Sequence, residues 1–283
     1  MMEAMTAAIE VSGLRKAYGS QAALRGIDFT VARGEVFGLL GPNGAGKTTC
    51  VEVLEGYRER DSGDVHVLGR DPADRALRAK VGIVLQNCGT YPHLSARETV
   101  SHWASLYPAP RRVDEVLALA GLDDCADQRA RTLSGGQARR LDFALALVGD
   151  PELIFLDEPT TGFDPAARRT AWDVIRALKD LGKTVVLTTH YLDEAQALAD
   201  RVAILQNGLI LAEGPPKALG ASRYRVAWRA ADGTLEERFT EDPTALLHAL
   251  TTEALARGER LEELSVTRPS LEDVYLQLIE VAA

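Results

Sequence analysis

A glycine-rich segment carries the strongest chemical signal in the sequence. Residues 41–49 read Gly-Pro-Asn-Gly-Ala-Gly-Lys-Thr-Thr and match the pattern GxxxxGK[ST]. The segment stands between an apolar run, 36–40, and a helical stretch that begins at Lys47. Glycines allow backbone N–H groups to surround phosphate oxygens, and the N-terminus of the helix that follows favours negative charge. We therefore expect a phosphate-binding loop for a nucleotide.

The side chains of this phosphate loop have separate expected roles. Lys47 places a positive charge at the β and γ phosphates, and Thr48 offers a hydroxyl ligand for Mg²⁺. An ordinary glycine-rich turn is the alternative, and the strand and helix context argues against it. The expected nucleotide-binding residues of the loop are Gly41, Pro42, Asn43, Gly44, Ala45, Gly46, Lys47, Thr48 and Thr49.

Two adjacent carboxylates follow a second apolar strand. Residues 153–156 are Leu-Ile-Phe-Leu, and Asp157 and Glu158 come directly after them. A Mg-nucleotide site needs an acid at the C-terminal edge of a strand to hold the metal and its water shell. We expect Asp157 to serve there with Thr48, and Glu158 to polarise an attacking water. The alternative is a buried strand that ends in a solvated turn at Pro159, and the position about 110 residues after the phosphate loop favours the metal site.

The segment Leu-Ser-Gly-Gly-Gln at 133–137 lies some twenty residues before that strand. Ser134 is expected to cap a helix that continues to Val148, and the two glycines leave the first helical turn bare. This arrangement predicts a second anion-binding helix N-terminus in the same chain. A flexible Gly-Gly loop before a helix is the alternative. It does not explain why the chain has two helix N-termini that each combine glycines with a hydroxyl side chain.

The elements that must position these groups follow from hydrophobic periodicity. Apolar strands alternate with helical segments, which predicts a parallel sheet covered on both faces. Asn207-Gly208 between two apolar runs predicts a hairpin. The expected strands are 27–31, 36–40, 65–67, 81–85, 153–156, 184–187 and 202–205, and the expected helices are 47–57, 113–119, 141–148, 165–181 and 191–199.

Two regions depart from this alternation. From about Leu94 to Val148 the pattern is helical, with no comparable strand. Composition changes near Gly220, where a hairpin (224–228 and 235–239), a helix (244–256) and a strand (261–266) follow, and Ser270 with Glu272 predicts a capped final helix. We expect a main domain over 1–220 and a small α+β domain over 221–283.

Composition excludes several classes of protein. The balance of 32 Lys+Arg against 41 Asp+Glu gives a net charge of −9, which argues against broad binding to nucleic acid. No apolar run approaches the roughly 18 to 20 residues that cross a bilayer, and the N-terminus lacks a secretory signal. Cys50, Cys88 and Cys125 have no metal-binding spacing. These features predict a cytoplasmic chain with reduced thiols.

Together, the phosphate loop, the 133–137 segment and the strand ending in Asp157-Glu158 resemble the ATP-binding subunit of ABC transporters, over about residues 7–220. The resemblance implies an α/β P-loop NTPase core with a parallel sheet, an antiparallel β subdomain and a helical subdomain at about 94–148. It also implies hydrolysis of ATP with Mg²⁺ by a head-to-tail dimer of two copies. In such a dimer Ser134, Gly135, Gly136 and Gln137 of one copy close over the γ-phosphate held by the other.

The resemblance assigns four further positions. Gln86 matches the glutamine loop, which senses Mg²⁺ and the γ-phosphate and touches the permease, and His190 matches the switch histidine at the γ-phosphate. Asp164 matches the dimer-contact loop, and Tyr18 matches the aromatic residue that stacks on adenine. Each also has an ordinary alternative as a surface or structural residue. The catalytic set is therefore Glu158, His190, Gln86 and Lys47, and the metal set is Thr48, Gln86 and Asp157.

Weaker marks indicate the branch of the family. Residues 91–94 with Arg97-Glu98, the run 190–195 and the run 269–276 resemble the drug-resistance (daunorubicin-type) exporters. The resemblance implies a separately encoded membrane permease that holds the ATPase at the inner face of the membrane and exports a drug, antibiotic or lipid-like compound. Phe163, Ala138 and Cys50 depart from the usual family residues, and none of them removes a group with a chemical role.

Other uses of the same motifs stay open from the sequence. A DNA-repair or chromosome ATPase shares them but usually separates its nucleotide halves with long coiled coils, whereas about 55 residues fill that interval here. A translation factor of this type needs two nucleotide modules in one chain. An importer ATPase and a non-enzymatic assembly scaffold are the remaining alternatives. A neighbouring gene for a six-span membrane protein would favour export, and one for a secreted binding protein would favour import.

Overall fold

The computed structural model describes residues 7–84, 91–219, 224–230, 233–267, 271–273 and 275. The chain divides into two compact units, Met1–Ala212 and Glu213–Ala283. Each unit is described by itself below.

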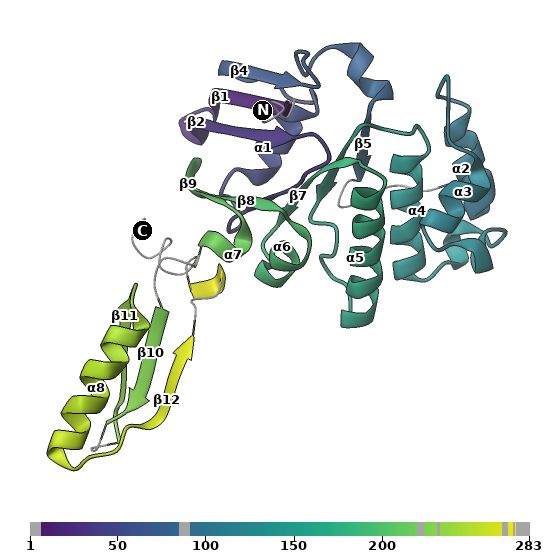
Figure 1. Cartoon of the computed structure of the whole chain (residues 1–283). Coiled ribbons are helices and arrows are strands. Elements are labelled where there is room, and N and C mark those ends of the chain that lie inside the picture. The colour runs from purple at the N-terminus through teal and green to yellow at the C-terminus, as the bar shows by residue number, and fades with distance from the viewer. Residues whose placement is uncertain are drawn as a thin grey trace, which may run out of the picture. The chain divides into compact units, whose positions relative to one another are not determined.

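A six-stranded sheet forms the centre of the first unit (Figure 1). The strand order is β5-β6-β7-β3-β8-β9, and all neighbours from β5 to β8 pair in parallel. This confirms the parallel sheet that the sequence predicts. Since β3, β6 and β7 are neighbours, their carboxyl ends meet at one edge although they lie far apart in the sequence. The bounds are β3 Val36–Leu40, β5 Val81–Val84, β6 Leu153–Asp157, β7 Thr184–Thr189, β8 Arg201–Gln206 and β9 Leu209–Gly214.

Both faces of this sheet are covered, which explains why its strands are apolar at nearly every position. Successive residues of a strand point to opposite faces. Ile154 and Leu156 accordingly belong to one buried cluster, and Leu153 and Phe155 belong to another. The first cluster includes residues of α4 (Gly135–Leu147) and α5 (Pro165–Asp180), and the second includes residues of α1 (Lys47–Leu54). A further short helix, α6 (Leu192–Leu198), follows β7.

A three-stranded antiparallel sheet supplies the rest of the second cluster. Its order is β2-β1-β4, with β1 at Ala7–Tyr18, β2 at Gln21–Ala32 and β4 at Ser62–Val67. Its buried side chains, such as Ile9 and Val31, pack in the cluster that contains Cys50 of α1. The antiparallel β subdomain is confirmed, and it holds the helix of the phosphate loop from one side.

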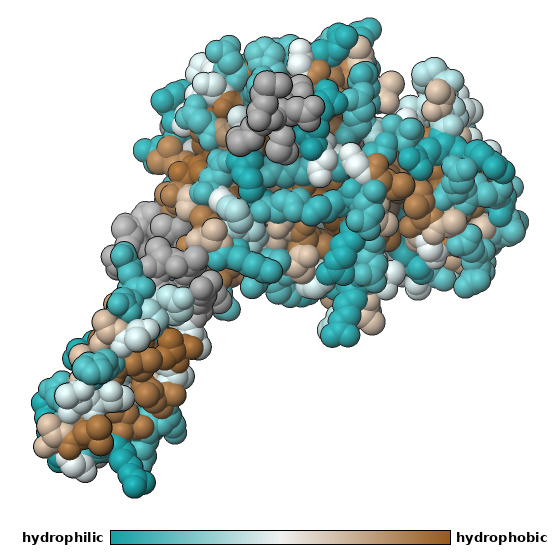
Figure 2. All heavy atoms as spheres, in the orientation of Figure 1, coloured by the Kyte–Doolittle hydropathy of each residue, from teal (hydrophilic) through white to brown (hydrophobic). Residues whose placement is uncertain are grey.

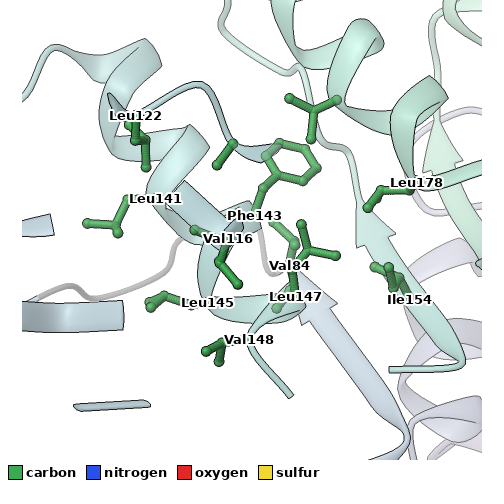
Figure 3. Close-up of a cluster of buried hydrophobic side chains, with 14 of the residues drawn as sticks. Val84, Val116, Leu122, Leu141, Phe143, Leu145, Leu147, Val148, Ile154 and Leu178 are labelled. Carbon is green, nitrogen blue, oxygen red and sulfur yellow. The ribbon is translucent and has the colours of Figure 1, made fainter. Parts of the chain in front are cut away.

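Between β5 and β6, the described residues from 91 onward form helices and turns, as the sequence predicts. This segment contains α2 (Ala96–Ala104), α3 (Val113–Leu119) and α4, with short 3₁₀ turns at Asp123–Cys125 and Ala130–Thr132. Figure 3 shows how Phe143 of α4 lies among side chains from α3, the sheet and α5, including Val116, Ile154 and Leu178. One continuous core therefore joins the helical subdomain to the central sheet.

The described residues of the second unit form a three-stranded antiparallel sheet, the long helix α8 and the short helix α7. The sheet has the order β11-β10-β12, and Val226 and Trp228 of β10 pack against Leu250 of the helix α8. Strands and a helix in this unit agree with the small α+β domain that the sequence predicts. Hydrophobic side chains also lie on the surface of this unit (Figure 2). The predicted cap at Ser270 lies outside the described residues. The bounds are α7 Pro216–Leu219, β10 Tyr224–Arg229, β11 Leu235–Thr240, α8 Pro243–Arg257 and β12 Glu262–Thr267.

The boundary between the compact units falls within β9, whereas composition places a domain boundary after residue 220. Since β9 hydrogen-bonds to β8 in the large sheet, we keep the boundary after residue 220 as a proposal. Within the described ranges of the chain, no helix combines the length and the apolar character that a membrane crossing requires.

Candidate functional site

The phosphate loop joins the end of β3 to the start of α1, at the carboxyl edge of the sheet. Two of its glycines are required by their surroundings. A Cβ on Gly41 would lie 2.2 Å from the carbonyl oxygen of Leu205, and one on Gly46 would lie 2.6 Å from that of Ala23. Gly46 also has a φ of 110°, which L side chains rarely adopt. The loop can hold its shape only with glycine at these positions.

Lys47 is buried, and its ammonium group turns back over the loop. Its Nζ donates hydrogen bonds to the carbonyl oxygens of Gly41, at 2.8 Å, and Pro42, at 3.2 Å. Burial lowers the pKa of Lys47, while the negative charges of Glu158 and Asp157 oppose that shift. The loop thus holds a cation where a phosphate would approach.

One residue of the neighbouring strand β7, Thr188, makes hydrogen bonds with both acidic residues at the end of β6. The hydroxyl of Thr188 donates to Oδ1 of Asp157, at 2.5 Å, and accepts a hydrogen bond from the backbone N–H of Glu158, at 3.0 Å. The same N–H also donates to the carbonyl oxygen of Thr188, at 3.2 Å. Thr188 therefore fixes the carboxylate of Asp157 and the backbone of Glu158. Sequence reasoning missed this role because a threonine inside a buried strand gives no separate signal.

Two predicted site residues, Lys47 and His190, approach one carboxylate oxygen of a third, Glu158. Oε1 of Glu158 lies 3.8 Å from Nζ of Lys47 and 3.3 Å from Nδ1 of His190. The other oxygen, Oε2, accepts a hydrogen bond from the hydroxyl of Thr161, at 3.0 Å. The structure thus brings together a cation, a carboxylate and an imidazole from three different loops. This arrangement can bind phosphate groups and orient a water molecule for attack.

The donor atoms near this site fit Mg²⁺. Thr48 supplies an exposed hydroxyl and Asp157 a carboxylate, both of them the hard oxygen ligands that Mg²⁺ prefers. In the part of the chain that the structure describes, no group of three or more His, Cys, Asp or Glu side chains is arranged to hold a metal by itself. A cation here would depend on few protein oxygens together with phosphate and water, which is how Mg²⁺ usually binds with a nucleotide.

Tyr18 lies at the end of β1, beside the phosphate loop. The residue is 43 % exposed, and its hydroxyl lies 3.5 Å from Oγ1 of Thr49. The guanidinium carbon of Arg58 stands 5.1 Å from the ring centroid, in a cation–π contact. The tyrosine is therefore held near the loop, with enough exposed ring to receive a flat base.

The segment 133–137 caps α4 as the sequence predicts for Ser134. Its Oγ accepts a hydrogen bond from the N–H of Gln137, at 3.2 Å, and Oε1 of Gln137 accepts one from the N–H of Ser134, at 2.8 Å. Gln137 thus completes a capping box, which the spacing Ser-x-x-Gln makes visible in the sequence although we did not predict it. A Cβ on Gly135 would meet no atom within 4 Å, so packing in this chain does not require glycine there.

A cavity of about 520 Å³ lies in front of this segment. The start of α4, the loop 161–164 and the first turns of α5 line it. Asp164 lies at its rim, where Oδ1 accepts hydrogen bonds from the N–H groups of Ala166 and Ala167 and caps α5. Among the described residues, none of the phosphate loop lines this cavity. Of the two predicted anion-binding helix termini, only the start of α4 lines this cavity.

Gln86 was predicted from the resemblance to sense Mg²⁺ and the γ-phosphate. It lies outside the described residues, between Val84 at the end of β5 and Tyr91. Its role stays a prediction.

Comparison with known proteins decides the family. Residues 24–161 match the family described as ABC transporter. The daunorubicin resistance ATP-binding protein DrrA3 of Streptomyces coeruleorubidus is 37 % identical over 301 residues, which cover 96 % of this chain and 95 % of that protein. The chain belongs to the ABC transporter family. It is an ATP-binding subunit and an ATPase, as the sequence motifs predict.

Two further relatives extend the comparison of this ABC ATPase. The Nod factor export ATP-binding protein I of Paraburkholderia xenovorans is 40 % identical over 295 residues, covering 96 % of this chain and 97 % of that protein. A dimeric structure of the ATP-binding cassette MJ0796 bound to ADP and Pi has a TM-score of 0.65 and 26 % identity, and covers 73 % of this chain and 98 % of that one. ABC cassettes of this fold thus bind nucleotide and form dimers.

Proposed function

We propose that this ABC ATPase hydrolyses Mg·ATP at the interface of a head-to-tail dimer and thereby powers export through a separate membrane permease. The single observation that carries the dimeric site is the separation of the two anion-binding termini. The cavity in front of the segment 133–137 is lined by no described residue of the phosphate loop, and this observation supports a second copy that brings the two termini together.

The bare start of α4 supports this arrangement. Gly135 has open space around its Cα and an ordinary backbone conformation, so neither packing nor strain accounts for glycine. Without side chains, the N–H groups of the first turn stay accessible, and the helix dipole favours an anion in front of them. These features suit contact with the γ-phosphate that the phosphate loop of the partner copy holds. Asp164, at the rim of the same cavity, would then lie at the dimer contact.

The residues of one site have distinct proposed tasks. Lys47 and the loop N–H groups hold the phosphates, and Tyr18 stacks on adenine. Mg²⁺, when bound by Thr48 and Asp157, supplies positive charge that offsets the charge on the phosphates. Glu158 orients the attacking water and takes its proton, and His190 contacts the γ-phosphate from the neighbouring strand end. Gln86 is proposed to sense the metal and the γ-phosphate.

Mixing two inactive variants tests the dimeric site. Lys47→Ala removes the phosphate cation, while Gly135→Asp adds a repelling charge that the start of a helix tolerates well. A mixed dimer holds one intact site only if the segment 133–137 acts on the other copy. Random mixing should then restore about a quarter of the wild-type ATPase rate. Half of the dimers are mixed, and each mixed dimer keeps one intact site out of two. No recovery in mixed dimers, confirmed by differently tagged copies, would refute the proposal.

Relatives support the proposed direction of transport. The names of the relatives from Streptomyces coeruleorubidus and Paraburkholderia xenovorans state drug resistance and Nod factor export. We propose export of a drug, antibiotic or lipid-like compound, with the chain bound to its permease at the inner face of the membrane. Co-purification with the membrane protein encoded beside it, followed by an ATPase assay with candidate compounds, tests this. Stimulation only by a secreted binding protein would instead indicate an importer.

A further inference from the structure

A fully buried carboxylate, Glu194, lies four residues after His190. It has no task in the mechanism proposed above. Its side chain has no solvent exposure, and burial raises its pKa. Oε1 accepts hydrogen bonds from the hydroxyl of Thr160, at 2.8 Å, and from Nε1 of Trp172, at 3.1 Å. One oxygen atom of α6 therefore anchors both α5 and the segment that follows Glu158.

The backbone of Glu158 needs such an anchor. Its φ is 45°, in the left-handed region that is unfavourable for a residue with a long side chain. Strained conformations of this kind persist only where the surrounding structure fixes them. The hydrogen bonds from Thr188 fix the start of the turn, and the contacts at residues 159 and 160 must fix its end.

Those contacts come from buried charged groups on two different helices. Nε of Arg139, on α4, donates to the carbonyl oxygen of Pro159, at 3.3 Å. Glu194, on α6, receives the hydroxyl of Thr160. Since the proline ring removes most of the freedom of residue 159, holding Thr160 fixes the path of the chain from Glu158 onward.

We propose that Glu194 is a positioning residue for ATP hydrolysis. Through Thr160 it holds the strained turn at Glu158, so that the carboxylate stays between Lys47 and His190. Because Glu194 and His190 belong to one short loop and helix, the same bond sets the spacing between the imidazole and Glu158. The proposal depends on the role of Glu158 proposed above.

Substitution of the two residues that donate to Oε1 of Glu194 distinguishes positioning of Glu158 from general stabilisation of the fold. Thr160→Val and Trp172→Phe each remove one hydrogen-bond donor to Oε1 of Glu194. Valine nearly matches the shape of threonine, whereas phenylalanine is smaller than tryptophan and also removes part of its packing on the core. Both should lower the thermal midpoint, and Trp172→Phe should lower it at least as much as Thr160→Val because it also loses packing. Only Thr160→Val should lower kcat, by about tenfold, with the KM for ATP unchanged, because only it releases the turn at Glu158. Trp172→Phe should keep kcat within about twofold, and Glu194→Gln, which retains the acceptor, should behave in the same way.

The assay is made on the full chain below both thermal midpoints, with Glu158→Gln in the same series. Equal effects of Thr160→Val and Trp172→Phe on kcat would overturn the proposal. A normal kcat for Thr160→Val beside an inactive Glu158→Gln would overturn it as well, while leaving the role of Glu158 intact. Normal hydrolysis by Glu158→Gln would instead remove the proposed function on which the inference depends.

Discussion

Nζ of Lys47 lies 3.8 Å from Oε1 of Glu158, although the two residues are about 110 positions apart in the sequence. The contact exists because β3 and β6 both flank β7 and end at the same edge of the sheet. It places the cation proposed to bind phosphate beside the carboxylate proposed to activate water. Removal of the Lys47 ammonium should therefore affect ATP binding, and removal of the Glu158 carboxylate should affect hydrolysis.

Glu158→Gln should retain ATP binding and lose turnover. The amide keeps the size of the side chain but cannot accept a proton, and loss of a general base typically costs a factor of about 10² to 10⁴. An ATP-bound dimer should accumulate, and size-exclusion chromatography with ATP and Mg²⁺ checks this. Glu236→Gln, at an exposed position of β11, is the matched control. A Glu158→Gln variant with wild-type turnover would contradict the assignment.

Lys47→Ala should lose affinity for ATP. The ammonium is buried against the loop carbonyls, and a charge-assisted contact with phosphate contributes about 1.5 to 3 kcal/mol, so Kd should rise by at least tenfold. Calorimetry with ATP gives the affinity. Lys217→Ala, on α7, should bind as the wild type does. Retained tight binding by Lys47→Ala would count against the proposed phosphate contact.

Tyr18→Ala should weaken binding of the base, and Tyr18→Phe should not. Stacking of a base on an aromatic side chain contributes about 1 to 3 kcal/mol, so the KM for ATP should rise by roughly tenfold in the alanine variant. The phenylalanine ring preserves the stacking surface and loses only the hydroxyl contact with Thr49. Equal KM values for the two variants would show that the ring does not stack.

Glu55 should make stability depend on pH. It ends α1, and no described residue makes a hydrogen bond to its buried Oε1. Burial, aided by the charges of Asp157 and Glu52, raises its pKa from 4.5 to about 8. Between these two values the folded protein keeps a proton that the unfolded chain has released. The free energy of unfolding must then fall as pH rises from about 4.5 to about 8, by at most about 1.4 kcal/mol per pH unit.

Glu55→Gln keeps the shape of the side chain and cannot ionise. It should flatten this part of the pH profile and raise stability at pH 8 relative to the wild type. Urea unfolding at three pH values across the window measures the slope. An unchanged slope in the variant would show that Glu55 does not carry the effect.

Sequence patterns predicted the elements of the site better than its internal contacts. The apolar runs 36–40, 153–156 and 184–187 became β3, β6 and β7, because strands buried on both faces need apolar side chains throughout. Ser134 capped its helix as expected. Helix ends differed by a few residues: α1 ends at Leu54, where the expected helix continued to Tyr57.

Contacts between distant segments could not be predicted in the same way. Nothing in the run 190–195 indicates that Glu194 is buried, since acids on short helices are usually exposed. Its burial depends on Thr160 and Trp172, which reach it only after the sheet has formed. The strained backbone of Glu158 is likewise a property of the assembled loops.

The position of the helical segment in the chain has a further consequence. The chain leaves the sheet at β5 and returns at β6, its immediate neighbour, so everything between Val84 and Leu153 is an excursion that starts and finishes at adjacent strands. In the described part of this segment no strand joins the sheet, so β3, β6 and β7 pair without it. Insertions in the exposed turns of this segment should therefore leave the strand order intact, whereas changes at Val100 or Val116, which lie in the core shared with β6 and β7, should disturb it.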